Sequence, residues 1–156
     1  MIYLECKPDR VLVTTLGIPS KEIQHESHKV RVCKRLEKST NSKGLVDEDP
    51  SSTQPTYIRR LELHSNEHDI KLLYDEKTQN YLIVLCPRLE VWILKAATEA
   101  KVNVKNYDLP NTPEELHNII NTKVGKFMNL IQNIKEKSRM LKTLEDFVKN
   151  KQHILK

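Results

Sequence analysis

The chain has 156 residues and a net charge of +5, enough for one domain with a single hydrophobic core. The excess charge lies at the end of the chain, because residues 1–100 hold 15 of the 26 Lys/Arg and 15 of the 21 Asp/Glu, which leaves 11 and 6 for residues 101–156. There is no apolar run near the ~20 residues that span a bilayer and no secretory-signal pattern, and three cysteines without a C-x-x-C pair indicate free thiols, so we expect a cytoplasmic protein without a membrane partner.

Hydrophobic periodicity predicts alternating strands and helices over the first hundred residues. The apolar run Met1–Leu4 is typical of a buried strand, and Lys7–Leu16 follows with apolar positions at helical spacing. After these we predict a weak strand at 22–24, a helix at 28–38, strands at 44–46, 69–74 and 81–85, and a helix at 89–100, with 56–64 ambiguous. The alternation favours an α/β fold with a small central, largely parallel sheet flanked by helices.

The rest of the chain divides into a linker and a basic helical extension. Residues 102–113 contain two prolines and are predicted to link a domain at 1–101 to an amphipathic extension at 114–156. Apolar residues of the extension recur every three, four or seven positions, which predicts one long helix or a helical hairpin. We expect this apolar stripe to pack on the domain; its second possible use is to bind a protein partner or to form a homodimer. The stripe consists of Leu116, Ile120, Val124, Phe127, Ile131, Ile134, Leu141, Leu144 and Val148.

Acidic residues follow two of the predicted strands. Glu5 follows the first strand, and Asp47 and Asp49 follow the strand at 44–46. The carboxyl ends of parallel strands form the edge where α/β proteins bind ligands. In an extended chain, residues two apart point the same way, about 7 Å from each other. If the two strands are neighbours, these three carboxylates suit Mg²⁺ or Mn²⁺, which prefer hard oxygen ligands.

This ordered arrangement resembles the Toprim domain, the metal-binding catalytic module of topoisomerases, primases and OLD-type nucleases. The matching features are a first strand that ends in Glu, then helix, weak strand and helix, then a strand that ends in Asp-x-Asp. They are carried by IYLECKPDRVLVTTLG, GLVDEDP and LIVLCPRLEVWILKAA, so the resemblance covers roughly residues 1–100. The chain would be a small, stand-alone Toprim-like protein.

The resemblance implies a metal-dependent nuclease that cleaves nucleic-acid phosphodiesters with Mg²⁺ or Mn²⁺. Glu5, Asp47 and Asp49 would be its catalytic residues and metal ligands, with Glu5 as ligand or general base. Asp9 and Glu90 would be auxiliary acids. Basic residues of the extension would bind the nucleic-acid backbone through salt-sensitive contacts. These are Lys123, Lys126, Lys135, Lys137, Arg139 and Lys142.

A non-catalytic role is the main alternative. The glycine that usually follows the Toprim glutamate is Cys6 here. This departure favours a Toprim-like interaction subunit of a larger nucleic-acid-processing or defence complex. Asp47 and Asp49 also suit ordinary turn or helix-capping roles, because aspartate accepts bonds from backbone N–H groups.

Three other interpretations have weaker support. The Asp-x-Asp also resembles the nucleophile motif of haloacid-dehalogenase-like phosphatases, but Pro50-Ser51 stands where that family has Gly-Thr. A response-regulator receiver domain would need a lysine where residues 86–88 read Cys-Pro-Arg. His25, His28 and Cys33 have no fourth ligand at zinc-site spacing, so surface histidines are the simpler interpretation.

Overall fold

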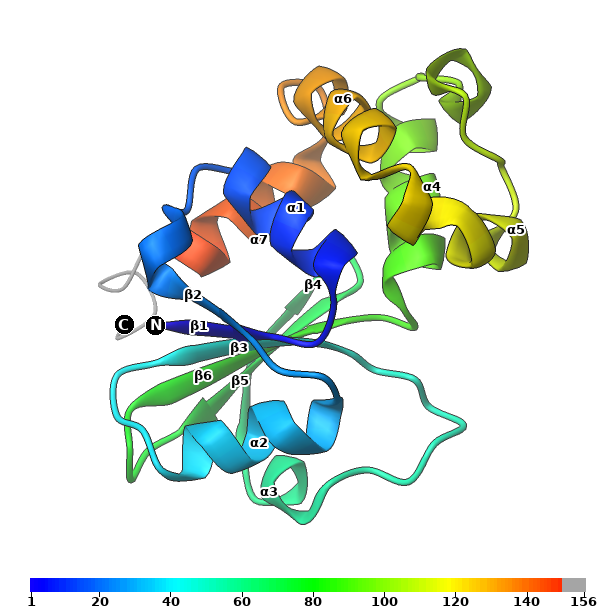
Figure 1. Ribbon diagram of the computed structural model, residues 1–156. Coiled ribbons are helices and arrows are strands. Elements are labelled where there is room, and N and C mark those ends of the chain that lie inside the picture. The colour runs from blue at the N-terminus through cyan, green and yellow to red at the C-terminus, as the bar shows by residue number, and fades with distance from the viewer. Residues whose placement is uncertain (150–156) are drawn as a thin grey trace.

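A six-stranded sheet organises the fold in the computed structural model, which describes residues 1–149 (Figure 1). Its strands are β1 (Ile2–Leu4), β2 (Ile23–His25), β3 (Lys43–Asp47), β4 (Glu62–Glu67), β5 (Ile70–Asp75) and β6 (Asn80–Leu85). They lie in the order β2-β1-β3-β6-β5-β4. The first four in this order run parallel, whereas β5 is antiparallel to β6 and β4 is antiparallel to β5. The predicted α/β fold with a largely parallel sheet is confirmed.

Helices alternate with the parallel strands, as the periodicity predicted. The α-helices are α1 (Lys7–Thr15), α2 (Lys29–Glu37), α3 (Thr56–Arg59), α4 (Leu89–Glu99), α5 (Pro113–Ile119), α6 (Val124–Ile134) and α7 (Arg139–Lys149). Short 3₁₀ turns are η1 (Ser20–Glu22), η2 (Val104–Tyr107) and η3 (Ile120–Thr122). The first helix shows how local sequence sets these bounds. Pro8 lies in its first turn, and Gly17 just beyond its end has φ +110°, a conformation that glycine adopts without strain.

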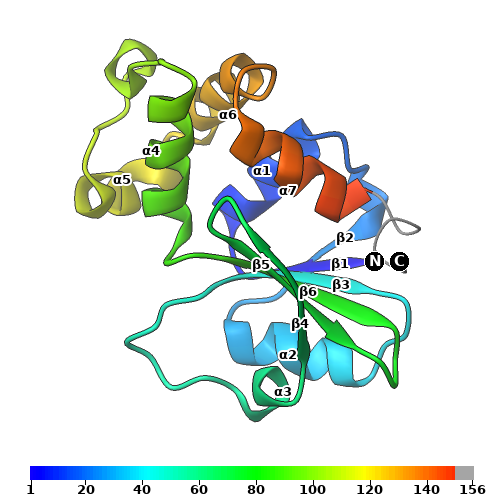
Figure 2. The ribbon, with the colours of Figure 1, turned by 180° about the vertical axis from the view of Figure 1, so that it is seen from behind.

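The helices cover both faces of the sheet (Figures 1 and 2). On one face, Val32 and Leu36 of α2 and Tyr57 of α3 pack with Leu82 and Val84 of β6. On the opposite face, α1, α4, α5, α6 and α7 contribute to the main core. That core includes Trp92, which is fully buried as expected for a core residue. Helices therefore cover both faces of the central strands, and the strand ends are places where polar side chains can gather.

The C-terminal region is not the predicted long helix or hairpin. Between residues 113 and 149 the chain forms α5, α6 and α7, and it changes direction at Lys123, whose φ of −125° and ψ of 40° are not helical. A second break lies before α7, where the Ser138 hydroxyl accepts a bond from Leu141 N at 3.2 Å and donates to Glu99 of α4 at 2.6 Å. Residues 150–156 of the predicted extension lie outside the described residues.

The apolar stripe of this region packs within the chain's own core. Eight of its nine residues are buried, all but Val124. Lys43 at the start of β3 donates to the carbonyl of Phe147 at 2.7 Å, which joins α7 to the sheet. Val104 and Leu109, from the stretch predicted as a linker, are buried in the same core. The stripe packs on the domain, as expected, and is not an exposed docking surface. No helix within residues 1–149 has the length and apolar character needed to cross a membrane.

Candidate active site

The strands that end in Glu5 and Asp47 are neighbours, which is the condition on which the predicted site depends. β1 and β3 pair in parallel with Leu4 opposite Leu45, so their following residues emerge at the same edge. One Glu5 oxygen, Oε2, accepts a hydrogen bond from the backbone N–H of Asp47 at 3.0 Å. The carboxyl edge of the sheet therefore brings these two acids together.

Asp47 also connects β3 to the start of α4. Its Oδ1 accepts a hydrogen bond from Leu89 N, the first residue of that helix, at 3.1 Å. Arg88, the residue before the helix, provides no side-chain cap of its own, so Asp47 caps the helix from a neighbouring strand. The helix-capping interpretation of Asp47 is thus correct for one of its oxygens, and it does not conflict with a place in the acidic cluster.

Asp9 is a buried carboxyl in the first turn of α1. Asp9 is 1% exposed, and among residues 1–149 no group makes a hydrogen bond of ordinary geometry to either of its carboxylate oxygens. Burial raises the pKa of Asp9 well above its usual value, and the charges of Asp47, Glu5 and Glu90 raise it further, while the Cys6 thiol offsets part of the rise. An unpartnered buried carboxylate is costly, so this group is either protonated or balanced by a cation.

The neighbouring acids are shifted in the same direction. Burial, followed by repulsion from Glu5 and Glu90, raises the pKa of Asp47 from 3.8 to about 7. Burial also raises the pKa of Glu5, against the opposing effect of its bond from Asp47 N and of the Lys29 ammonium. We call Glu5, Asp9, Asp47 and Glu90 the carboxylate cluster. Its members come from the ends of β1 and β3 and from the first turns of α1 and α4.

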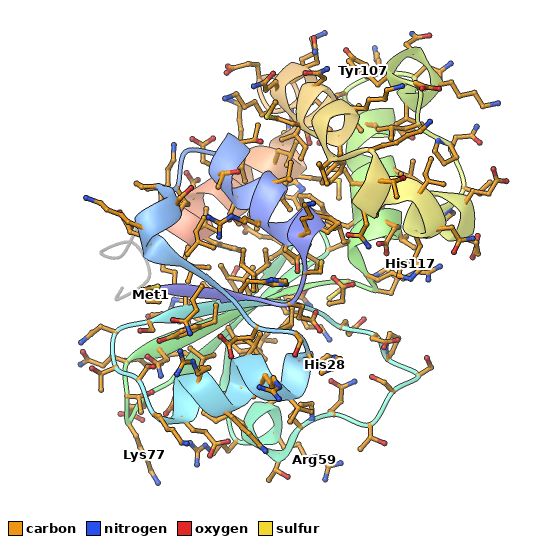
Figure 3. All side chains as sticks on the ribbon, viewed as in Figure 1. Met1, His28, Arg59, Lys77, Tyr107 and His117 are labelled. Carbon is orange, nitrogen blue, oxygen red and sulfur yellow. The ribbon has the colours of Figure 1, made fainter. Side chains whose placement is uncertain are left out.

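The predicted auxiliary acid Glu90 lies at the side of this cluster that faces α5. Its side chain is 8% exposed, and Oε2 lies 3.3 Å from Nδ1 of His117. Figure 3 shows His117 by α5 and His28 by α2, both on the side of Met1 toward which β1 runs. This side is where the parallel strands end. Asp9 and Glu90 therefore both lie beside the pair that the sequence predicted.

The extended Asp-x-Asp geometry predicted for Asp49 is wrong. β3 ends at Asp47, and Asp49 adopts φ +43°, a left-handed conformation that aspartate tolerates better than most residues. Its N–H donates to the carbonyl of Pro87 at 2.8 Å, and its own carbonyl accepts from Ser52 N. The turn leaves Asp49 exposed at the rim of the carboxylate cluster, where its charge still raises the pKa of Glu5.

Two cations beside the cluster were not predicted. Lys29, at the start of α2, donates to the Glu48 carbonyl at 2.8 Å and to Gln54 Oε1 at 3.1 Å. Lys71 of β5 pairs with the Glu48 carboxylate at 2.8 Å. The place of Lys29 beside the cluster could have been predicted from the sequence, because helices of a parallel α/β fold begin at the carboxyl edge of the sheet and Lys29 begins one of them. Lys71 comes from an antiparallel strand, whose placement the sequence did not indicate.

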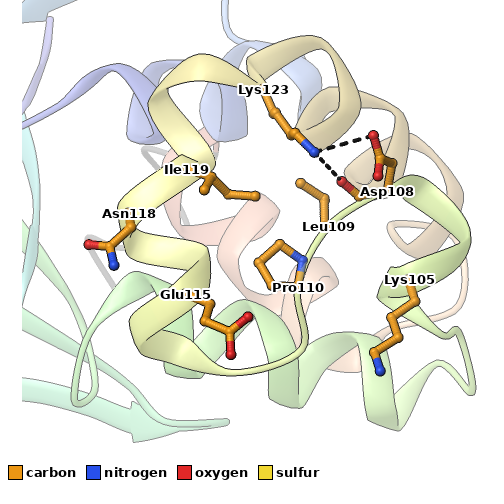
Figure 4. Close-up of a pocket in the computed structure, with 8 residues that line it drawn as sticks. All are labelled: Lys105, Asp108, Leu109, Pro110, Glu115, Asn118, Ile119 and Lys123. Atoms are coloured by element: carbon orange, nitrogen blue, oxygen red, sulfur yellow. Dashed lines mark hydrogen bonds and ion pairs between the residues drawn. The ribbon is translucent and has the colours of Figure 1, made fainter.

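The basic residues predicted to bind nucleic acid fall into two groups. Lys123 donates to the carbonyl and to Oδ2 of Asp108, at 3.1 and 3.2 Å, at the wall of a separate cavity of about 400 Å³ (Figure 4). Lys126 also pairs with Asp108, and Lys135 donates to the carbonyl of Thr15 at 3.3 Å. The second group, at the α6–α7 junction, consists of Lys137, Arg139 and Lys142, all of them exposed.

The carboxylate cluster contains oxygen donors of the kind that hard divalent cations prefer. Among residues 1–149, no three His, Cys, Asp or Glu side chains are arranged as a metal-binding group. The cluster nevertheless combines hard oxygen donors, raised pKa values and two buried oxygens of Asp9 without partners. A hard cation relieves this kind of repulsion, and Mg²⁺ needs only one or two protein carboxylates.

Comparisons with known proteins identify no relative. No family model matches the chain, and no curated protein or solved structure matches it significantly. The functional conclusion therefore depends on the residues at the carboxyl edge of the sheet.

Proposed function

We propose that this chain is a Toprim-like, divalent-metal-dependent nuclease that hydrolyses nucleic-acid phosphodiesters. The observation that carries the proposal is the carboxylate cluster, which gathers acids from four separate elements and in which burial, followed by repulsion from Glu5 and Glu90, raises the pKa of Asp47 to about 7. Such shifts are concentrated at functional sites, and the cluster lies where α/β folds bind their ligands.

Glu5 and Asp47 are the residues that would hold Mg²⁺ or Mn²⁺, with Asp49 at the rim and Asp9 and Glu90 beside them. A bound cation supplies acidity to a coordinated water and neutralises charge on phosphate oxygens. Where Glu5 is not a ligand, its carboxylate is suited to accept the proton of the attacking water, and burial raises the pKa of this group above its usual value. Asp47 is held in a fixed orientation by its bond from Leu89 N.

Cations of the chain support a polyanionic substrate. Lys29 lies close enough to the carboxylate cluster to lower the pKa of both Glu5 and Asp47, so it is suited to contact a phosphate bound there. Farther away, exposed basic side chains near the start of α7 would bind the backbone at a distance from the cleaved bond through salt-dependent contacts. These are Lys137, Arg139 and Lys142.

A non-catalytic interaction subunit is the second candidate. It is supported by Cys6, whose thiol lies half-buried against Asp9 where the Toprim pattern has glycine, and burial raises the pKa of this thiol so that it stays neutral. It is also supported by the arrangement of the acids, since no three of the described side chains form a metal-binding group. In this case the cluster would hold no cation and would have a structural role.

Cleavage assays separate the two candidates. The purified chain is incubated with plasmid DNA, single-stranded DNA and RNA in Mg²⁺, in Mn²⁺ and in EDTA. The variants are Asp47→Ala and Asp47→Asn, of which Asn keeps an acceptor for Leu89 N, and the matched control is Asp146→Asn at an exposed position of α7. We expect metal-dependent cleavage that falls at least 100-fold in both Asp47 variants and persists in the control. Absence of cleavage by folded protein would contradict the nuclease and favour the interaction subunit.

A further inference from the structure

A cavity of about 440 Å³ opens directly beside the carboxylate cluster, on the face of the sheet that carries α2 and α3. Asp47 belongs to both the cluster and the wall of this cavity. A ligand in the cavity would therefore lie next to any group bound at the cluster. Its aliphatic part comes from Ile58, Leu63, Leu73 and Val84, and Glu48, Pro50, Gln54 and Lys71 complete the wall.

The aliphatic wall continues across neighbouring strands. Leu63 of β4 and Leu73 of β5 are cross-strand partners. Leu63 is 59% exposed, an unusual exposure for a large apolar side chain in this structure. Ile58 faces them from α3, while Val84 extends the surface onto β6. The cavity thus presents apolar surface to water at a place that residues 1–149 leave uncovered.

Polar groups at the edge of the cavity are fixed by contacts with one another. Lys71 pairs with the Glu48 carboxylate at 2.8 Å, and Gln54 Nε2 donates to the Glu48 carbonyl at 3.1 Å. Lys29 bonds to the Glu48 carbonyl and to the Gln54 side chain, which ties the loop after β3 to α2. The cavity is therefore preformed, with a cation at its edge and an aliphatic interior.

We propose that this cavity receives the nucleobase of an unpaired nucleotide adjacent to the cleaved phosphodiester. This inference rests on the proposed nuclease function and adds that the substrate is single-stranded or locally unpaired. A base has two flat apolar faces that pack on aliphatic side chains, and its polar edges would remain near Lys71 and Gln54. A base inside a duplex is stacked and paired, so it is not available to a cavity of this kind.

Binding tests the cavity independently of cleavage. The probes are adenosine 5′-monophosphate and ribose 5-phosphate, which share the phosphate and sugar but differ in the base. Each is titrated in EDTA with the thermal midpoint as readout, since a ligand that binds only the folded state raises it. Leu63→Trp fills the cavity, and Val30→Trp is the matched control, because Val30 is 48% exposed on α2 and does not line the cavity.

We expect the nucleotide, and not ribose 5-phosphate, to raise the midpoint of the wild-type protein and of Val30→Trp. Leu63→Trp should bind the nucleotide at least tenfold more weakly. Equal effects of the two probes, or an unchanged response in Leu63→Trp, would overturn the proposal. Failure of the nucleotide to bind would also overturn it and would leave the aliphatic surface to an apolar side chain of a protein partner.

Cleavage adds a second readout that separates this inference from the proposed function. The wild-type protein should cleave a single strand at least tenfold faster than the same sequence in a duplex, and Leu63→Trp should lose most of the single-strand rate. Equal rates on the two substrates would overturn the base-binding cavity while the nuclease stands. If the wild-type protein cleaves neither substrate but still binds the nucleotide more tightly than ribose 5-phosphate, the nuclease function is refuted and base binding in the cavity is supported.

Discussion

Replacing Asp47 with Asn should make the folded chain more stable at neutral and alkaline pH. In the folded state the pKa of Asp47 is raised from 3.8 to about 7, first by burial and then by Glu5 and Glu90. Well below pH 3.8 the carboxyl is protonated in both the folded and the unfolded state, so it does not change the free energy of unfolding. Between pH 4 and pH 7 the unfolded chain releases this proton first, so the free energy of unfolding falls as pH rises, and the cost is constant above pH 7.

The size of the effect follows from the same shift. The difference between 3.8 and about 7 corresponds to about 4 kcal/mol at roughly 1.4 kcal/mol per pH unit. Asp47 is half-buried and its neighbours can take up part of the charge, so about 2 to 4 kcal/mol should remain at pH 8. Asn keeps the acceptor for Leu89 N, so the substitution removes the charge and retains the helix cap.

Urea unfolding at pH 4 and pH 8 in EDTA measures the effect. The Asp47→Asn variant should unfold at a higher urea concentration than wild type at pH 8 and at nearly the same concentration at pH 4. Asp146→Asn, which removes an exposed charge, should match wild type at both pH values. Equal stability of Asp47→Asn and wild type at pH 8 would refute the reasoning, because it would mean that Asp47 is not repelled in the folded state. A gain of equal size at pH 4 would refute it too.

Two further predictions concern packing and nucleic-acid binding. Gly44→Ala should destabilise the fold by about 1 to 3 kcal/mol in urea unfolding, because the added Cβ would lie 2.8 Å from Val32 Cγ1 and 2.9 Å from Leu82 Cδ1. Gly125→Ala in α6 is the control: its Cβ meets open space, so it should stabilise the fold by up to about 1 kcal/mol. Replacing the exposed basic residues by Gln should weaken the salt dependence of binding to single-stranded DNA, with the slope of log affinity against log salt reduced by about 2. Fluorescence anisotropy measures this slope, and an unchanged slope would exclude these residues from the interface. The residues replaced together are Lys137, Arg139 and Lys142.

The fold was largely predictable up to β3 and again from β5 to α4, because apolar residues there follow helix and strand periods closely. The segment between β3 and β5, which forms α3 and β4, was not predictable. Five of the six β4 residues are exposed, so this edge strand has no apolar pattern, and α3 has only four residues. The breaks at Lys123 and Ser138 were also missed, since neither is a glycine or proline. The apolar stripe continues through both, and periodicity alone cannot distinguish one helix from several.

The candidate site was predictable where topology decides it. Parallel strands place Glu5 and Asp47 at one edge, and the structure has these strands as neighbours. The extended conformation predicted for Asp49 was wrong because the chain turns immediately after β3, and the run of three acids at 47–49 gives no sign of this turn. The complete burial of Asp9 was not predicted, because it depends on helices that pack around α1 from distant parts of the chain. His117 reaches Glu90 only because α5 packs on α4, a contact without a local sequence signal.

Protons and a divalent cation would compete for the same carboxylates, and this competition decides between the two proposed functions. Asp47, with a pKa of about 7, is mostly protonated at pH 5.5, so a cation would have to displace its proton. At pH 8 Asp47 is mostly ionised and repelled by Glu5 and Glu90, and a cation would relieve that repulsion. If the site binds metal, Mn²⁺ should raise the thermal midpoint more at pH 8 than at pH 5.5, EDTA should reverse the shift, and Asp47→Asn should lose it. A shift of equal size at both pH values, or one that survives in Asp47→Asn, would mean that Mn²⁺ binds elsewhere. The carboxylate cluster would then have a structural role, as the interaction subunit requires.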